Sequence, residues 1–400
     1  MDDFKSAATI MDNKLKILLV EDSESDADLL IRFLKKEKID FSFIRVWNKD
    51  AFIKALKENN YDLIIADHTL PQFSGMEAFR IAKNENKNIP FILVTGTVTE
   101  NILTIYAKEG IDDYLLKENL LRLPSAIEHV ISKKKIEELH EKLKIAHKDI
   151  QDSINYAKTI QNAMLPDTVL LSDSFPESFI LFKPKDILSG DFYWFRKEEN
   201  SFFTAVADCT GHGIPGALMS MIGIEKLNNL VHKTLEPSEI LNQLNKSIEF
   251  ALCQSTQYEH SQNGMDIALC SIDKDNRILK FSGANRPLWI ICHGQTEVEE
   301  IKGTKKAIGG LTTVLSPNFD SYEKKLQQGD TFYIFSDGYA DQFGGEHNKK
   351  LTTKKFKQLL LNIQDKTMSQ QEKYLNNFIE DWKAGTEQVD DILVIGVRQK

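Results

Sequence analysis

The sequence predicts a multidomain protein with an α/β domain first, a long helix next and an α+β domain last. Its 400 residues exceed what one hydrophobic core usually supports, since single cores stop growing near about 250 to 300 residues. Apolar runs alternate with helix-period segments before residue 133, and strand-like runs dominate after residue 168. We therefore expect a tail at 1–13, an α/β domain at 14–132, a helical linker at 133–167 and an α+β domain at 168–400.

The overall composition is that of a folded protein, with 42% hydrophobic and 27% charged residues. A net charge of −9 argues against a nucleic-acid partner, because such binding depends on Lys and Arg neutralising phosphates. The four cysteines form no CxxC pair and are expected to be reduced thiols. No apolar run approaches the roughly 18 residues of a membrane span, and no signal peptide is evident. We expect a cytoplasmic protein that binds no membrane.

The first domain contains five short apolar runs that predict strands: KILLVED, FSFIRVW, DLIIADH, PFILVTG and DDYLLK. Segments such as SDADLLIRFLKKE and DAFIKALKENN separate them, and their apolar residues recur every three or four positions. Alternating strands and helices are typical of a parallel sheet covered on both faces. In such a sheet, ligands bind at the carboxyl ends of the strands.

The linker has the pattern of one long helix with a narrow, mostly apolar stripe. It contains neither Gly nor Pro between 133 and 165, and it would extend roughly 50 Å at about 1.5 Å per residue. Its charged flanks leave little to cover the stripe within one chain, so we expect a coiled-coil homodimer, with packing on neighbouring domains as the alternative. The stripe comprises Ile136, Leu139, Leu143, Ala146, Ile150, Ile154, Ala157, Gln161 and Met164.

The last domain is rich in β-branched and aromatic runs that predict strands: FILFKP, FFTAVAD, DIALCSID, ILKFSG, LWIICHG, TFYIFSD and DILVIGVR. Two segments, ALMSMIGIEKLNNLVHKTL and PSEILNQLNKSIEFALCQ, have helical periodicity. Runs of strands with helices set apart indicate an α+β sandwich.

Polar residues follow four of the strands predicted in the first domain. Glu21 and Asp22 follow the first strand, Asp67 the third, Thr95 the fourth and Lys117 the fifth. In a parallel sheet these side chains meet at one edge, and clustered carboxylates favour a hard divalent cation such as Mg²⁺. In such a site one carboxylate attacks a phosphoryl donor while the cation, the lysine and the hydroxyl share the transferred charge.

The Val20-Glu21-Asp22 triplet and the loop from Asp67 to Pro71 resemble motifs of response-regulator receiver domains. The resemblance implies a flavodoxin-like fold and a histidine kinase that phosphorylates Asp67. It also implies a Mg²⁺ site, made of Glu21, Asp22, Asp67 and the backbone carbonyl of Thr69, and the switch residues Thr95, Tyr114 and Lys117.

One departure from the receiver pattern is Glu118, which follows Lys117 where the family usually has proline. A cis peptide before a residue other than proline costs ~3 to 4 kcal/mol, so we expect a trans peptide here. Taken alone, Asp22 would suit a helix N-cap and Asp67 a turn; together, at the right strand ends, they favour the phosphoryl site.

The last domain has its own set of aspartates at predicted strand ends, namely Asp191, Asp208, Asp337 and Asp390. Three of them stand beside glycine or in glycine-rich turns, which permit close approach of a ligand to the backbone. Four carboxylates without a matching Lys or Arg in these motifs need cations, and two divalent ions bridged by water would satisfy them. The absence of Cys or His ligand pairs favours Mg²⁺ or Mn²⁺ over zinc.

This second set resembles the PPM-type metal-dependent serine/threonine phosphatases, in the bacterial branch of sporulation and stress-response regulators. The resemblance implies a β-sandwich flanked by helices, a hairpin at SGANRPLWII, and an anti-sigma-factor antagonist or similar phosphoprotein as substrate. It also implies two Mn²⁺ or Mg²⁺ ions held by Asp191, Asp208, Asp337, Asp390 and the backbone carbonyl of Cys209. The departures, Trp194 and Leu393, fall outside this ligand set.

Some residues keep two interpretations. His212 is either a general acid near the leaving oxygen or a cap of the following helix. Asp266 suits either the metal site or a turn, and the Lys183-Pro-Lys185 loop either meets substrate phosphate or is solvated.

The sequence thus predicts a phosphatase for phosphoserine or phosphothreonine that is controlled by phosphorylation of Asp67. A non-catalytic scaffold that binds partners is the alternative. A transcription factor is excluded because no basic helix-turn-helix follows the linker.

Overall fold

The computed structural model describes residues 14–71, 73–85, 88–96, 100–253, 264–309 and 318–400. The tail predicted at 1–13 lies outside the described residues. The chain divides into two compact units, Met1–Lys148 and Asp149–Lys400. Among the described residues, no helix has the length and apolar character needed to cross a membrane.

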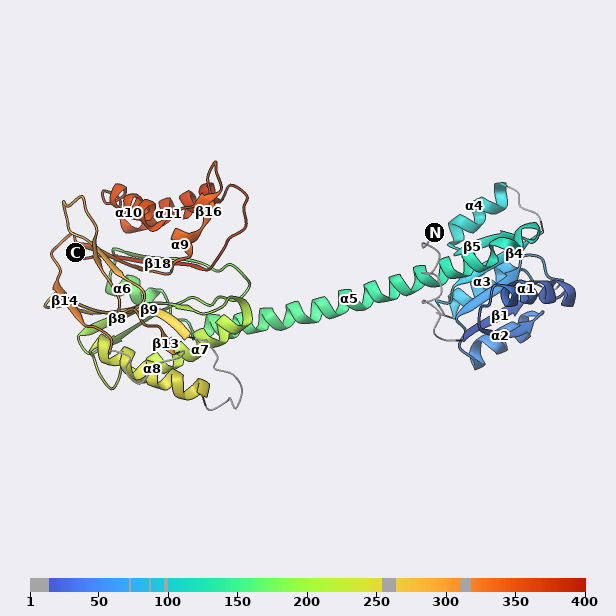
Figure 1. Ribbon diagram of the computed structural model, residues 1–400, viewed down its shortest axis with the longest axis horizontal. Helices are drawn as coiled ribbons and strands as arrows, with labels where there is room; N and C mark the ends of the chain where they lie inside the picture. The colour runs from blue at the N-terminus through green and yellow to red at the C-terminus, as the bar shows by residue number, and fades with distance from the viewer. Residues whose placement is uncertain (1–13, 72, 86–87, 97–99, 254–263, 310–317) are drawn as a thin grey trace. The chain divides into compact units, whose positions relative to one another are not determined.

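The first unit is built on a five-stranded parallel sheet in the order β2-β1-β3-β4-β5, which confirms the predicted α/β domain (Figure 1). All five predicted strands are present, and each keeps its apolar run. Their bounds are β1 (Leu15–Val20), β2 (Phe41–Val46), β3 (Leu63–Asp67), β4 (Phe91–Thr95) and β5 (Asp113–Leu116).

Alternate residues of these strands point to opposite faces, so the sheet has a separate core on each side. Leu18 and Ile64 pack with α2 (Lys49–Glu58), α3 (Gly75–Asn84) and α4 (Glu100–Glu109). On the other face, Ile17 and Ile65 pack with α1 (Glu24–Lys36) and the first turns of α5 (Leu123–Met164). The short 3₁₀ helix η2 (Lys117–Arg122) joins β5 to α5.

The predicted linker helix begins earlier in the sequence than expected and is continuous with the last helix of the first unit. Leu123, Ile127 and Val130 of α5 are buried beneath the parallel sheet, which explains why the helix already begins at Leu123. The helix continues across the boundary between the two units and ends at Met164. In its middle, the predicted stripe is exposed at Ile136, Leu139, Leu143 and Ile150.

The second unit is a sandwich of two antiparallel sheets, as predicted. The first has the order β14-β10-β9-β8-β7, with β13 paired to β9; the second has the order β12-β11-β15-β18-β6. The strands of the first sheet are β7 (Phe192–Glu198), β8 (Ser201–Cys209), β9 (Gly264–Asp273), β10 (Ile278–Ala284), β13 (Ile308–Gly309) and β14 (Tyr322–Lys325). Those of the second are β6 (Ser178–Lys183), β11 (Leu288–Ile291), β12 (Glu299–Ile301), β15 (Thr331–Phe335) and β18 (Ile392–Arg398).

Helices cover the outer face of each sheet (Figure 1). Residues of α7 (Gly213–Leu230) and α8 (Pro237–Cys253) pack on the first sheet, and residues of α10 (Thr353–Asn362) and α11 (Met368–Lys383) pack on the second. A third core, which includes Val206, Phe332 and Leu393, fills the space between the sheets. The remaining short elements are α6 (Val169–Ser174), α9 (Gly338–Asp341), β16 (Phe343–Gly344) and β17 (Lys349–Lys350).

The prediction of a hairpin at SGANRPLWII is wrong. Its two strands, β10 and β11, belong to different sheets, so the turn between them crosses from one layer of the sandwich to the other. The turn begins at Asn285, whose φ of 57° lies in the left-handed region that asparagine tolerates better than most residues. This crossing places Arg286 beside the second acidic cluster.

Candidate functional site

The first acidic cluster lies at the carboxyl edge of the parallel sheet, where the sequence predicts it. Asp67 is the last residue of β3, and Glu21 directly follows β1. Carboxylate oxygens of Glu21, Asp22 and Asp67 lie within 4.8 Å of one another, and no other such group of three metal-ligating side chains occurs among the described residues. Thr95 ends β4 at the same edge and is buried.

Lys117 occupies the centre of this cluster. Its Nζ donates to Asp67 Oδ2 at 2.7 Å and to Asp26 Oδ2 at 2.5 Å, and it lies 3.5 Å from Glu21 Oε2. The described backbone contains no cis peptide, so the Lys117–Glu118 bond is trans, as predicted. Asp26, which was not expected from the sequence, sits in the first turn of α1 and is one of three carboxylates within 4 Å of the lysine.

The electrostatics of this edge suit a divalent cation. The pKa of Glu21 is raised to about 7, mainly by burial and in part by the nearby Asp67 carboxylate. Glu21 Oε2 has no hydrogen-bond partner among the described residues, although Lys117 is close. A hard cation would supply the charge and the coordination that these oxygens lack.

An aromatic pair joins the predicted switch residue Tyr114 to the loop after Asp67. The rings of Tyr114 and Tyr106 lie 5.8 Å apart between centroids, and Tyr106 Oη is 2.8 Å from His68 Nδ1. The Thr69 backbone N–H donates to Asp67 Oδ1 at 3.3 Å. Sequence reasoning missed Tyr106 and His68, since only the fold brings α4 against the residue that follows Asp67.

The second acidic cluster forms where loops leave both sheets of the sandwich. Asp208 belongs to β8 and Asp191 directly precedes β7, whereas Asp337 follows β15 and Asp390 lies just before β18. Burial is the largest cause that raises the pKa of Asp208 to about 7. Burial and then the Asp208 carboxylate raise the pKa of Asp191 well above its ordinary value. The predicted aspartates are therefore brought into mutual electrostatic contact.

These aspartates fit divalent metal ions in their chemistry. All the donors are carboxylate oxygens, which hard cations prefer. Asp191 is buried, and its Oδ2 has no hydrogen-bond partner in the described part of the chain. Burial and then the Asp337 and Asp391 carboxylates raise the pKa of Asp390. A cluster of this kind gains stability when positive charge enters it.

Arg286, which the sequence did not single out, brings a buried positive charge into this cluster. Its Nη2 lies 2.8 Å from Asp208 Oδ2, 2.8 Å from Asp337 Oδ2 and 3.4 Å from Asp266 Oδ2. Burial alone lowers the pKa of Arg286, but the carboxylates of Asp208 and Asp337 raise it above its ordinary value. Asp266 therefore belongs to the acidic cluster rather than to an isolated turn.

Asp391, also missed, positions the loop that carries Asp191. Its Oδ1 accepts from the Lys185 N–H at 2.7 Å, and its Oδ2 accepts from the N–H groups of Gly190 at 2.7 Å and Asp191 at 3.3 Å. The side chain is buried. Of the Asp390-Asp391 pair, the second residue thus organises backbone. Nothing in the sequence of two adjacent aspartates shows which one would be a metal ligand and which one organises the backbone.

The end of α5 contacts the same loop. Gln161 is buried, and its Nε2 donates to the Ser189 carbonyl and to Ser220 Oγ, while its Oε1 accepts from the Ser189 N–H. Ser189 stands two residues before Asp191. Near its carboxyl end, the stripe of the linker helix therefore includes a polar side chain that holds the loop carrying Asp191.

The side chains of His212 and Cys209, which follow Asp208 in the sequence, have distinct environments. His212 occupies the N-cap position of α7 but makes no side-chain capping bond; its Nδ1 lies 2.8 Å from Asp186 Oδ2, and its ring is exposed. Cys209 ends β8 and is buried, which raises the pKa of its thiol well above the ordinary value. The Cys209 thiol is therefore suited to packing rather than to nucleophilic chemistry.

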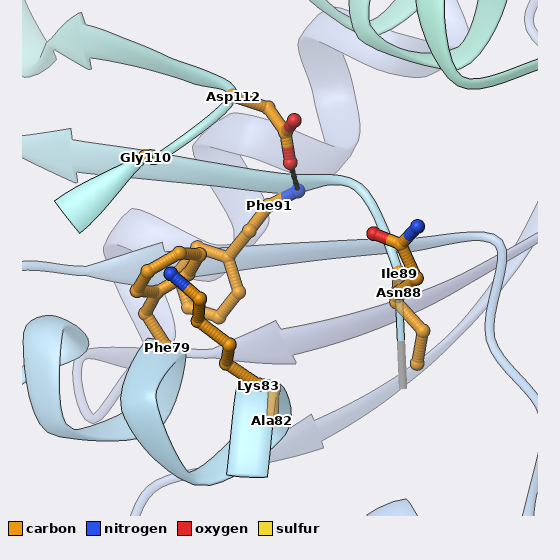
Figure 2. A pocket seen from close by; sticks show the side chains of 8 residues that line it. All are labelled: Phe79, Ala82, Lys83, Asn88, Ile89, Phe91, Gly110 and Asp112. Atoms are coloured by element: carbon orange, nitrogen blue, oxygen red, sulfur yellow. Dashed lines mark hydrogen bonds between the residues drawn. The ribbon is translucent and has the colours of Figure 1, made fainter. Parts of the chain in front are cut away.

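A pocket of about 320 Å³ lies away from the first acidic cluster, at the amino ends of the parallel strands. Figure 2 shows Phe79, Lys83 and Phe91 around it, with the Phe91 N–H donating to Asp112. Because Phe91 begins β4 and Thr95 ends it, the pocket is at the opposite edge of the sheet from Asp67. It contributes nothing to the phosphoryl site.

Comparison with known families assigns both units. The model described as "Stage II sporulation protein E (SpoIIE)" matches residues 198–400, which is half of the chain. The chain belongs to the SpoIIE family. The model described as "Response regulator receiver domain" matches residues 17–128, so this SpoIIE-family chain carries a receiver domain at its amino-terminal end.

Individual relatives agree with this assignment. The chain is 32% identical to the SiaA-PP2C domain of Pseudomonas aeruginosa, with a TM-score of 0.57, and the match covers 64% of this chain and 99% of that domain. It is 27% identical over 205 residues to phosphoserine phosphatase RsbU of Bacillus subtilis, covering 50% of this chain and 57% of that protein. Its receiver part is 34% identical over 130 residues to transcriptional regulatory protein RprY of Bacteroides fragilis, covering 31% of this chain and 54% of that protein.

The chain thus spans just over half the length of these two curated relatives. The residues that match the SpoIIE family include Asp208, Asp337 and Asp390, and the sandwich has the fold of a PP2C-type phosphatase.

Proposed function

We propose that the chain is a metal-dependent protein phosphatase for phosphoserine or phosphothreonine, controlled by phosphorylation of its own receiver domain. The observation that carries the proposal is the cluster of Asp191, Asp208, Asp337 and Asp390, which converge from both sheets of a SpoIIE-family sandwich. A scaffold that only binds partners has no use for mutually repelling buried carboxylates, which cost folding free energy unless a ligand compensates them.

The four aspartates, with the carbonyl of Cys209, would hold two Mn²⁺ or Mg²⁺ ions. Such ions polarise a phosphoryl oxygen and activate water for attack on phosphorus. The chain's own contribution is geometric: Asp391 fixes the backbone from Lys185 to Asp191, and Gln161 fixes Ser189. His212, exposed and paired with Asp186, is within the loop that follows Asp208 and is the candidate proton donor to the departing serine oxygen.

The receiver would supply the regulatory input. A histidine kinase would donate a phosphoryl group to Asp67, with Mg²⁺ held by Glu21, Asp22, Asp67 and the Thr69 carbonyl. Lys117, already on Asp67, would contact the new phosphoryl oxygens, and Thr95 would move toward them. Tyr114 contacts Tyr106, whose hydroxyl reaches His68 beside the phosphorylated residue. These contacts offer a route by which phosphorylation changes the receiver surface.

The substrate in this proposal is a phosphorylated regulatory protein of the anti-sigma-factor antagonist type. The support is the likeness to RsbU, which is named as a phosphoserine phosphatase. The proposal also includes a homodimer through α5, because Leu139, Leu143 and Ile150 are exposed along one stripe of the helix. Apolar residues at coiled-coil spacing are stable in water only when a second helix covers them.

The proposal is tested with the full chain and a panel of phosphoserine proteins, measuring phosphate release with Mn²⁺, with Mg²⁺ and with excess EDTA. We expect release that requires divalent metal and changes in rate when acetyl phosphate phosphorylates the receiver. Metal-saturated protein that binds a phosphoserine protein tightly but releases no phosphate would instead support the scaffold. Turnover that persists in EDTA would contradict the metal site.

A further inference from the structure

Arg286 is held rigidly at the rim of the second acidic cluster by its own backbone. It lies in the turn that crosses from β10 to β11, and its N–H donates to the Ala284 carbonyl at 2.6 Å. A Cβ added to Gly283 would lie 2.4 Å from the Arg286 carbonyl oxygen, and one added to Gly303 would lie 2.6 Å from it. Only glycine permits this approach from two sides, so the arginine backbone has little freedom to withdraw.

The guanidinium is directed inward, onto the oxygens that the metal ions require. Nη2 bridges Asp208 Oδ2 and Asp337 Oδ2 at 2.8 Å each, and the arginine side chain is only 14% exposed. Nε is buried and has no hydrogen-bond partner among the described residues. The arginine is thus paired through one end of its guanidinium and leaves another donor buried and unused, an arrangement that costs free energy and is not an optimal structural ion pair.

A lone pair of a carboxylate oxygen can bind either a divalent ion or a guanidinium N–H. It cannot bind both along the same direction at the same time. Asp208 and Asp337 therefore face two alternative cations, the arginine of their own chain and a metal ion from solution. We propose that Arg286 is a built-in competitor of the metal: it pairs with Asp208 and Asp337 when metal is absent, and metal binding must displace it. This inference rests on the proposed function, because it assigns the same aspartates to the metal site.

Two consequences follow from the competition. Without metal, the single positive charge of Arg286 offsets part of the repulsion between Asp208 and Asp337, which lowers the free-energy cost of folding the metal-free sandwich. Metal affinity is lower than the carboxylates alone would give, because entry of the ion requires breaking two charge-assisted hydrogen bonds. Arg286 thereby sets the metal concentration at which the domain becomes active. This role differs from that of the aspartates, which hold the metal.

The test measures metal binding in the full chain rather than activity. Mn²⁺ binding is titrated by calorimetry in an Asp22→Asn background, which weakens the receiver cation site, and compared between that protein and the same protein with Arg286→Gln. We expect affinity to rise by about tenfold or more, because even one of the two charge-assisted hydrogen bonds that no longer have to break accounts for that factor. Arg196→Gln, which removes an arginine of the same domain paired with Glu198, is the matched control and leaves the affinity unchanged.

A second measurement uses the wild-type chain, in which Arg286 is retained. The Nε–H resonance of Arg286, assigned by its disappearance in Arg286→Lys, is followed in the wild-type chain during titration with diamagnetic Mg²⁺. We expect it to shift and lose protection from solvent exchange as the metal site fills. This measurement also decides the matter if Arg286→Gln does not fold.

The outcomes separate the inference from the function on which it rests. Equal or weaker Mn²⁺ binding by Arg286→Gln, or an Arg286 resonance unmoved at saturating Mg²⁺, overturns the competition while leaving the metal site in place. If neither protein binds metal at its aspartates, the proposed metal-dependent function fails, and the inference fails with it. Tighter binding in Arg286→Gln together with a displaced resonance supports the competition.

Discussion

Gln161 of the linker helix and Ser189 of the metal-site loop are joined by reciprocal hydrogen bonds. Gln161 Nε2 donates to the Ser189 carbonyl at 2.6 Å, and Gln161 Oε1 accepts from the Ser189 N–H at 3.2 Å. Because both groups are buried, the pair responds to any axial rotation or shift of the last turns of α5. The helix that leaves the receiver thereby reaches the backbone that carries Asp191.

Replacing Gln161 with Ala should lower phosphatase rate by roughly 10- to 100-fold, the range typical when a group that orients a metal ligand is removed. The backbone of Ser189 would lose both bonds to Gln161, and the loop that carries Asp191 would be held less firmly, although its bonds to Asp391 remain. Initial rates at saturating Mn²⁺ measure the effect. Gln151→Ala, at an exposed position of the same helix, is the control. A Gln161→Ala protein with wild-type rate and metal affinity would show that the contact is only structural packing.

Asp391→Asn should destabilise the sandwich by about 1 to 3 kcal/mol, since a buried carboxylate that accepts three backbone N–H bonds is replaced by an amide with one acceptor. Urea unfolding of the full chain measures the change, and Asp381→Asn on the exposed side of α11 serves as the control. Metal affinity should fall at the same time. An unchanged unfolding midpoint would mean that Asp391 does not organise this loop.

Asp67→Asn should fold normally but take up no phosphate from acetyl phosphate, because an amide is a poor nucleophile and the cation site with Glu21 and Asp22 loses charge. Phosphate incorporation, detected as an acid-stable and base-labile modification, measures this. Asp50→Asn, exposed in α2, should be modified like the wild type. Incorporation by Asp67→Asn at the wild-type level would place the phosphoacceptor elsewhere.

Asn substitution of Asp208, Asp337 or Asp390 should each reduce the rate by about 10² or more, because each removes a negative ligand and leaves the water to be activated poorly positioned. Rates are compared with Mn²⁺ and after EDTA treatment followed by metal return. We expect the return of metal to restore the phosphatase rate of the wild type but not that of the variants. Rates within twofold of the wild type for all three variants would exclude these residues as ligands.

Leu143→Glu or Ile150→Glu should separate the homodimer and uncouple phosphatase rate from receiver phosphorylation, since a charge in an apolar helix interface is poorly tolerated. The coupling free energy between receiver phosphorylation and phosphatase rate that these variants would remove is expected to be ~1 to 3 kcal/mol, the usual size of allosteric coupling. Sedimentation at micromolar concentration measures association. Ile145→Glu, equally apolar and exposed but outside the stripe, should leave the dimer intact. Regulation that persists in a protein that is monomeric in both phosphorylation states would rule out this route.

Both domains and the first acidic cluster could be predicted from the sequence for a simple reason. In a parallel sheet every strand end lies at the same edge, so Glu21, Asp67 and Thr95 come together whatever the details of packing. The expected strand runs all appear, because short runs with alternating or continuous apolar character, bounded by turn residues, favour strands. Short edge strands such as β12 and β16 gave no comparable pattern and were missed.

The sequence by itself determined which residue types are available to each site: carboxylates, a lysine and glycine-rich turns at strand ends. Only the tertiary structure decided how those groups are paired. Arg286 reaches Asp208 because its turn crosses between sheets, and Gln161 reaches Ser189 because α5 packs its last turn into the sandwich. Such partners are far apart in the chain, and local periodicity carries no information about distance through space. Hydrogen bonds and ion pairs act over a few ångströms, so only the folded geometry selects them.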